Sequence, residues 1–136
     1  MRNVAALLSL LVLAGIGCSA DLTVRVPGTV TLNVGDRAAI QGTSWTVKFD
    51  SVVSDSRCPL GVLCIQAGEA RLAFALSDPL VDPSPNDNLH FILGTDGVVA
   101  GGFAFSQVEV SPIRRQNETI DPKSYVVKIM IEGVTR

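Results

Sequence analysis

From Leu22 onward, apolar residues recur at every second position of the chain, and no segment carries a sustained helical stripe. In the segment WTVKFD, Trp45, Val47 and Phe49 fall on one face, whereas the residues between them are polar. A strand that is buried on one side requires this alternation, because successive side chains of a strand point to opposite faces of the sheet. The pattern therefore predicts a chain of half-buried β-strands.

The same pattern, or an enrichment in β-branched and aromatic residues, marks the other segments that favour strands. We expect strands at residues 22–26, 29–34, 37–40, 45–50, 69–76, 89–93, 103–110 and 124–131. Within 103–110 the alternation changes phase, since the two phenylalanines share one parity and the two following valines share the other. An extra residue in one strand re-aims the side chains that follow it, so we predict a β-bulge near Ser106 or Gln107.

The residues between these segments are typical of turns and surface loops. Gly35 and Asp36 separate two expected strands and predict a two-residue hairpin turn. The longest connection, residues 77–88, contains three of the seven prolines, which remove ladder donors and favour an exposed loop. Turns at such short intervals predict an all-β fold, with a single antiparallel β-sandwich or small barrel.

The N-terminal segment differs from the rest of the chain. Arg2 precedes a largely apolar run of 13 residues, Val4 to Ile16, which ends in small residues. This is the plan of a secretory signal peptide, and the run is too short to span a bilayer. We therefore expect the chain to be exported.

Cys18 follows this run directly and resembles the lipobox cysteine of bacterial lipoproteins, which is acylated and becomes the new N-terminus. Gly17 fits that motif, whereas Gly15 stands where the motif usually has leucine. The alternative is cleavage after Ala20. We favour a lipoprotein-type signal peptide at residues 1–17, or alternatively 1–20, followed by one β-domain at residues 18–136.

Composition and charge argue against a nucleic-acid partner. The chain is 47% hydrophobic and 18% charged, which is enough to bury a core. Its formal net charge is -2, and removal of Arg2 with the signal peptide makes it -3. A nucleic-acid partner requires a basic stripe, and the one adjacent basic pair in the sequence is Arg114 and Arg115.

Candidate catalytic and metal-binding residues are few. His90 is the single histidine, and the alternation of its strand predicts an exposed side chain. Zinc needs about four nitrogen or sulfur ligands, and nucleophilic catalysis needs a neighbouring base, so His90 supports neither. We therefore predict that the chain is not an enzyme and that it uses no metal and no cofactor.

Calcium is the metal for which the long loop offers the most ligands. Oxygen-bearing side chains alternate there, at Asp82, Ser84, Asn86 and Asn88. The glycine and the glutamate that an EF-hand loop requires are missing, so turns beside the prolines are the preferred explanation.

Cys58 and Cys64 are the two cysteines that remain once Cys18 is acylated or removed. An even number of cysteines in an exported chain indicates a disulfide. Their five intervening residues do not fit the two-residue spacing of thioredoxin-like redox centres. We predict an intramolecular disulfide that holds the end of one strand against the start of the next and stabilises the fold by about 2 kcal/mol.

The residues around this pair resemble a known motif. DSRCP at 55–59, GV at 61–62, Cys64 and AG at 67–68 are similar to the pattern of a family of small uncharacterised bacterial envelope proteins, many of them lipoproteins. The resemblance covers most of the mature domain, because strands like TVKFDSV, EARLAF and YVVKIMI accompany the motif. This chain has Gln66 where the pattern usually has tryptophan. The resemblance implies export and a β-fold, and it implies no known activity.

Within the motif we expect structural roles first. Asp55 and Ser56 are expected to accept hydrogen bonds from nearby backbone amides. Arg57 is expected to pair with Asp55 or Glu69, and Gly68 to allow a bulge at the start of the next strand.

The apolar residues of the ring, Leu60, Val62 and Leu63, have two possible roles. They either cover one end of the core or form a tip that faces a partner. We prefer the first role, because loops that close the end of a sandwich are common.

These features predict a β-domain of the bacterial cell envelope, lipid-anchored through Cys18 at the outer membrane or the periplasmic face. It is expected to act by binding or by structural presence, with a protein or another envelope component as partner. The alternative is a secreted or soluble periplasmic inhibitor that presents the stapled 58–64 loop to a target enzyme. A stiff loop lowers the ordering cost of such binding.

Overall fold

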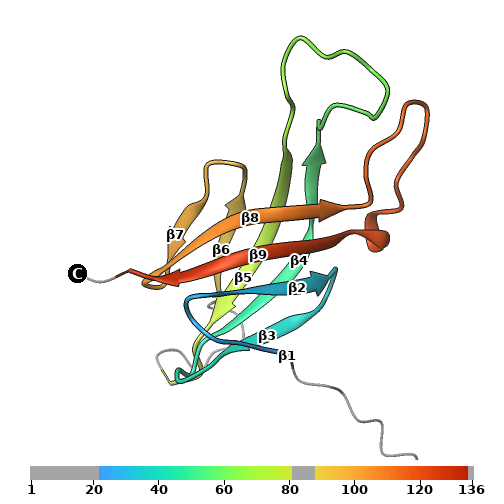
Figure 1. Ribbon diagram of the computed structural model, residues 1–136. Coiled ribbons are helices and arrows are strands. Elements are labelled where there is room, and N and C mark those ends of the chain that lie inside the picture. Colours follow the sequence, from blue (N-terminus) through green and yellow to red (C-terminus); the bar gives the residue numbers. More distant parts are fainter. Residues whose placement is uncertain (1–21, 81–87, 135–136) are drawn as a thin grey trace, which may run out of the picture.

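The computed structural model describes residues 22–80 and 88–134. The expected signal peptide, Cys18 and the calcium candidates Asp82, Ser84 and Asn86 lie outside the described residues. Within them the chain forms strands and one turn of 3-10 helix, η1 (Pro122–Ser124), as Figure 1 shows. No helix in this part of the chain is long and apolar enough to cross a membrane.

The strands form two sheets that pack together as a β-sandwich. The first sheet has the order β1-β3-β4-β5-β6, from β1 (Leu22–Val24), β3 (Arg37–Ile40), β4 (Thr46–Asp55), β5 (Ala70–Ser77) and β6 (Leu89–Leu93). The second has the order β2-β9-β8-β7, from β2 (Gly28–Asn33), β9 (Val126–Gly133), β8 (Phe103–Ser111) and β7 (Val98–Ala100). Among the described strands, β1 pairs with β3 in parallel and the other ladders are antiparallel. The predicted all-β fold is confirmed, and it is a sandwich.

Alternation along the strands places the apolar side chains between the sheets. In β9, for example, Val127, Ile129 and Ile131 are fully buried, whereas the residues between them are half-buried on the outer face. The five phenylalanines connect the two sheets through the core, because each ring contacts the next with centroids 4.8 to 6.4 Å apart. In order of contact they are Phe49, Phe74, Phe91, Phe105 and Phe103.

The predicted bulge in β8 is confirmed. The register of β8 against β9 shifts between Gln107 and Glu109, so the extra residue is Val108, which is exposed. The Gln107 amide, on the inner side of the bulge, donates to the carbonyl oxygens of Ala70 and Leu93, both at 2.8 Å. Since those carbonyls belong to the opposite sheet, the change of phase creates a polar link across the sandwich.

The hairpin prediction for Gly35 and Asp36 is wrong. A tight turn does form, with the Asp36 amide donating to the Asn33 carbonyl at 2.9 Å, but β2 and β3 lie in different sheets. The Gly35 amide also donates to the carbonyl of Phe49 in the first sheet, at 2.7 Å. The turn therefore carries the chain from one sheet to the other.

A two-residue hairpin turn is found instead at Gly101 and Gly102, between β7 and β8. Both glycines have positive φ, 58° and 85°, as the favoured hairpin turns require. β7 was not expected from its pattern, because its three residues are too few to show alternation. The Gly-Gly pair was the signal that could have revealed it.

Candidate functional site: two loops at one end of the sandwich

Two long connections project from the same end of the molecule, as Figure 1 shows. They are the β4–β5 loop, residues 56–69, and the β8–β9 loop, residues 112–125. The Leu60 amide donates to the Arg114 carbonyl at 2.8 Å, and Leu60 and Arg115 form an isolated parallel bridge. The two loops are therefore joined through their backbones and form one surface.

The predicted disulfide is present within the β4–β5 loop. Cys58 and Cys64 are bonded, with their Cα atoms 6.0 Å apart. The bridge does not hold the two strands together as expected, because both cysteines lie inside the loop. The strand ends are joined by Ser56, whose amide donates to the Glu69 carbonyl at 2.9 Å and whose hydroxyl accepts from the Glu69 amide at 3.0 Å.

Gly68 is required at the base of this loop by a close backbone approach. A Cβ at this position would lie 1.6 Å from the Ser56 carbonyl oxygen, which no side chain allows. The expected bulge at Gly68 is wrong. The irregularities of this strand pair lie within β4, between Phe49 and Ser51 and between Val52 and Ser54.

Arg57 fixes the loop to the second sheet. Its guanidinium donates twice to Asp55, from Nε to Oδ1 at 2.9 Å and from Nη2 to Oδ2 at 2.7 Å. It also donates to the Val110 carbonyl, and to the Pro112 carbonyl at 2.9 Å. Asp55 was one of its two expected partners, and Glu69 instead lies 3.9 Å from Arg71. The two carbonyls were not foreseen, because they lie more than fifty residues away along the chain.

Asp55 is the centre of this polar group. Its carboxylate accepts from the Arg57 amide at 3.1 Å, as predicted, and from the Tyr125 hydroxyl at 2.9 Å, and its side chain is only 8% exposed. Burial alone would raise the pKa of Asp55, but the hydrogen bonds from Arg57 and Tyr125 outweigh it and lower the pKa below the usual 3.8.

The pKa values of the two partners of Asp55 shift in the opposite direction, upward. The hydrogen bond to Asp55 raises the pKa of Arg57 above its ordinary value. Burial, followed by the hydrogen bond to the same carboxylate, raises the pKa of Tyr125. The group therefore consists of one carboxylate, one guanidinium and one neutral phenol at neutral pH. The hydrogen bond of the phenol links the end of β4 to Tyr125, the residue before β9.

Four apolar side chains of the two loops are exposed, whereas Ile120 and Tyr125 of the β8–β9 loop pack in or against the core. We define the apolar tip as Leu60, Leu63, Ile65 and Ile113, which are 58%, 101%, 104% and 63% exposed. The preferred expectation, that Leu60, Val62 and Leu63 cover one end of the core, is therefore wrong for Leu60 and Leu63, whereas Val62 is half-buried. Neither Leu60 nor Leu63 packs against the core, and the loop residues that do are Ile120 and Tyr125.

A surface hollow of about 240 Å³ lies beside the tip, within the β8–β9 loop. It is lined by Pro112, Ile113, Arg115, Glu118, Thr119, Ile120, Asp121 and Ser124. Since Arg115 is the bridge partner of Leu60, this hollow and the tip belong to one surface. The loop end therefore offers both protruding apolar side chains and a recess.

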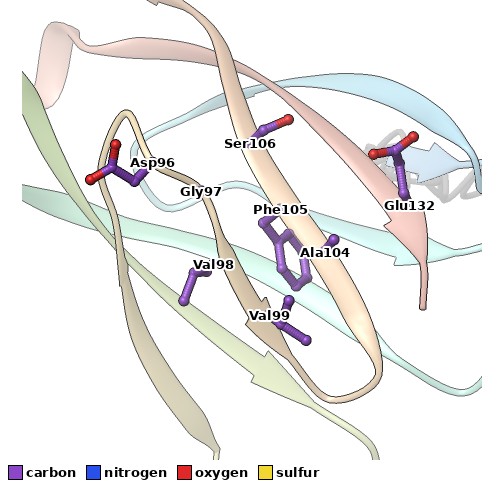
Figure 2. Close-up of a pocket in the computed structure, with 8 residues that line it drawn as sticks. All are labelled: Asp96, Gly97, Val98, Val99, Ala104, Phe105, Ser106 and Glu132. Atoms are coloured by element: carbon purple, nitrogen blue, oxygen red, sulfur yellow. The ribbon is translucent and has the colours of Figure 1, made fainter. Parts of the chain in front are cut away.

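A larger hollow, of about 400 Å³, lies on the outer face of the second sheet. Figure 2 shows Asp96 before β7 and Glu132 on β9 at its two sides, with Ser106 between them. The described residues that line it include no histidine, lysine, arginine or cysteine. Among these lining residues Ser106 therefore has no imidazole or amine base beside it, and the two carboxylates lie on separate elements.

His90 lies on the outer face of the first sheet, away from both hollows. Its side chain is 67% exposed, as predicted, and its Nδ1 is 3.7 Å from Asp50. Lys48 approaches the same carboxylate to 2.6 Å. No group of three or more His, Cys, Asp or Glu residues capable of holding a metal ion occurs in the part of the chain that the structure describes.

Comparison with family models, with curated proteins and with solved structures gives no match to this chain.

Proposed function

We propose that this chain is an exported β-domain of the bacterial cell envelope, tethered through a lipid on Cys18, and that it acts by binding rather than by catalysis. Its binding surface is the apolar tip with the adjoining hollow. The observation that carries this proposal is the full exposure of Leu63 and Ile65 on a loop that is closed by a disulfide and attached to the sandwich through Arg57.

Exposed aliphatic side chains that cluster at one site are the usual mark of an interaction surface. Fully burying a leucine or isoleucine stabilises by about 1.5 to 3 kcal/mol, so covering Leu63 and Ile65 would contribute several kcal/mol to a complex. The disulfide and the Arg57 contacts order the loop before any partner arrives. Less entropy is then lost on binding.

The binding surface is tested by affinity purification from an envelope extract, with the mature chain as bait. We expect one protein to be recovered in stoichiometric amount by the wild type and lost with Leu63→Asp or Ile65→Asp. Val99→Asp is the matched control, because Val99 is an equally apolar, 64% exposed residue on β7, remote from the loops. Equal recovery by all these variants would contradict the proposal.

The anchor is tested by the intact mass of the mature protein isolated from cells. A diacyl or triacyl addition on Cys18 is expected. An unmodified product that begins at Asp21 would refute the anchor and leave the binding surface untouched.

A secreted inhibitor is the second candidate. It is favoured by the stapled ring, because a preorganised protruding loop fits the concave site of an enzyme. Stoichiometric inhibition of one purified hydrolase, abolished by Leu63→Asp, would support this candidate. A partner that keeps its full activity in the complex would exclude it.

A further inference from the structure

The backbone of the apolar tip has hydrogen-bonding groups that the protein does not use. Within the described residues, the amides of Leu63, Cys64, Ile65 and Gln66 donate no hydrogen bond. The neighbouring amides of Leu60 and Val62 do, to the Arg114 and Pro59 carbonyls. The most exposed part of the tip therefore carries a row of free donors between its apolar side chains.

These donors distinguish between the surfaces that could cover the tip. In the hydrocarbon of a bilayer no acceptor is present, and each unsatisfied backbone group costs several kcal/mol. Two aliphatic side chains contribute no more than that. A protein partner avoids the loss, because its own carbonyl groups can accept from these amides.

Charge at the loop end gives a second property of the partner. Arg57 is neutralised by Asp55, and Arg115 is 3.8 Å from Glu118. Arg114 donates to the Arg57 carbonyl at 3.1 Å, and no carboxylate of the described residues is within ion-pair distance of it. A carboxylate on the partner, at the rim of the contact, would complement this cation.

The length of chain before β1 gives a third argument. Leu22 is four residues after Cys18, so an extended tether reaches about 14 Å at most. Leu22 is paired with Ala38, and Ala38 with Val47, eight residues before the end of β4 at Asp55. Eight residues of strand span about 26 Å. The tip, beyond Asp55, is therefore held away from the point of lipid attachment, in agreement with the low position of β1 in Figure 1.

We infer, building on the proposed binding function, that the tip docks into an apolar cleft of a folded protein that offers backbone carbonyl acceptors and carries carboxylates at its rim. Leu63 and Ile65 enter the cleft, their amides pair with its backbone, and Arg114 contacts the acidic rim. The lipid anchor at the other end leaves this surface free.

Photo-cross-linking in cells tests this inference, with benzoylphenylalanine placed at 63, at 65 or, as control, at 99. One adduct with a protein other than this chain is expected from 63 and 65 and not from 99. With that protein purified, we expect Leu63→Asp and Arg114→Gln each to weaken binding by about tenfold or more. Arg114→Lys should bind nearly as wild type, because it keeps the charge, and Arg37→Gln is the control for an exposed arginine on β3.

Vesicles of phosphatidylethanolamine and phosphatidylglycerol test the alternative, with the lipid-free chain from Asp21 onward. We expect no co-sedimentation at physiological salt. Co-sedimentation that Leu63→Asp abolishes would overturn the inference in favour of a lipid surface, and an adduct of twice the mass of the chain would overturn it in favour of a second copy. Either result keeps the proposed binding surface. If no adduct forms, the vesicles are not bound and the chain stays monomeric, the proposed function fails as well.

Discussion

The core and the apolar tip contain the same kinds of side chain in opposite surroundings. Leu72 and Leu93 are completely buried between the sheets, whereas Leu63 and Ile65 are completely exposed. In the core, apolar packing itself orders the chain. At the tip, a disulfide and the Arg57 hydrogen bonds do this, so the apolar groups remain available for a partner. Stability and binding should therefore be separable by mutation.

The largest difference in stability between a core substitution and a tip substitution is expected from Phe74→Ala. Phe74 is fully buried and stacks on Phe49 and Phe91, so its loss should lower the free energy of unfolding by about 4 kcal/mol. The matched change at the tip, Ile65→Ala, should alter it by less than about 0.5 kcal/mol. Urea unfolding of both variants measures the difference. Equal destabilisation would show that the tip is part of the core.

Arg57→Ala should have the next largest effect. It removes the charge partner of a nearly buried carboxylate and frees two carbonyls, and breaking such a pair costs about 3 kcal/mol. Arg71→Ala is the control, because the contact of Arg71 with Glu69 is long and exposed and contributes about 0.5 kcal/mol or less. The comparison fails if both variants unfold at the same urea concentration.

Removal of the disulfide should disorder the tip while leaving the two sheets of the sandwich folded. With both cysteines replaced by serine, we expect a loss of about 2 kcal/mol in unfolding free energy and an unchanged β-type circular dichroism spectrum. Binding of the partner should weaken, because the ring is no longer ordered. Labelling of both cysteines by a thiol reagent in native protein would rule out the disulfide.

The smallest effect on stability is expected from a change of pH that protonates Asp55. Because the folded protein lowers the pKa of Asp55 below 3.8, its contribution is fully present above that pH and is lost as the pH falls through the lowered value. Unfolding free energy should therefore fall more steeply below about pH 4 in the wild type than in Asp55→Asn. Tyr125→Phe should reduce the steepness, since it removes one bond that lowers the pKa. Parallel curves for all three proteins would contradict this role of Asp55.

The local sequence pattern was sufficient to predict those features that depend on residues close together in the chain. Alternation in β9 and the change of phase in β8 led to correct strands and to the bulge that follows Gln107, at Val108. The pairing of Cys58 with Cys64 followed from the count of cysteines and the short ring. In β4 the strand was expected to end at Asp50 but continues to Asp55, because its bulges interrupt the alternation while the ladder with β5 goes on.

The sequence by itself thus determined the strands other than β7, the burial of one face of these strands and the disulfide, because these depend on side-chain period and on short spacing. Only the tertiary structure decided which sheet each strand joins, so that Gly35 and Asp36 connect two sheets instead of closing a hairpin. It also brought Tyr125 to Asp55 across 70 residues and left Leu63 and Ile65 uncovered. The local sequence around an apolar loop residue is the same whether another segment buries that residue or leaves it exposed. Its burial depends on contacts with segments that are distant in the chain, and no local pattern reports such contacts.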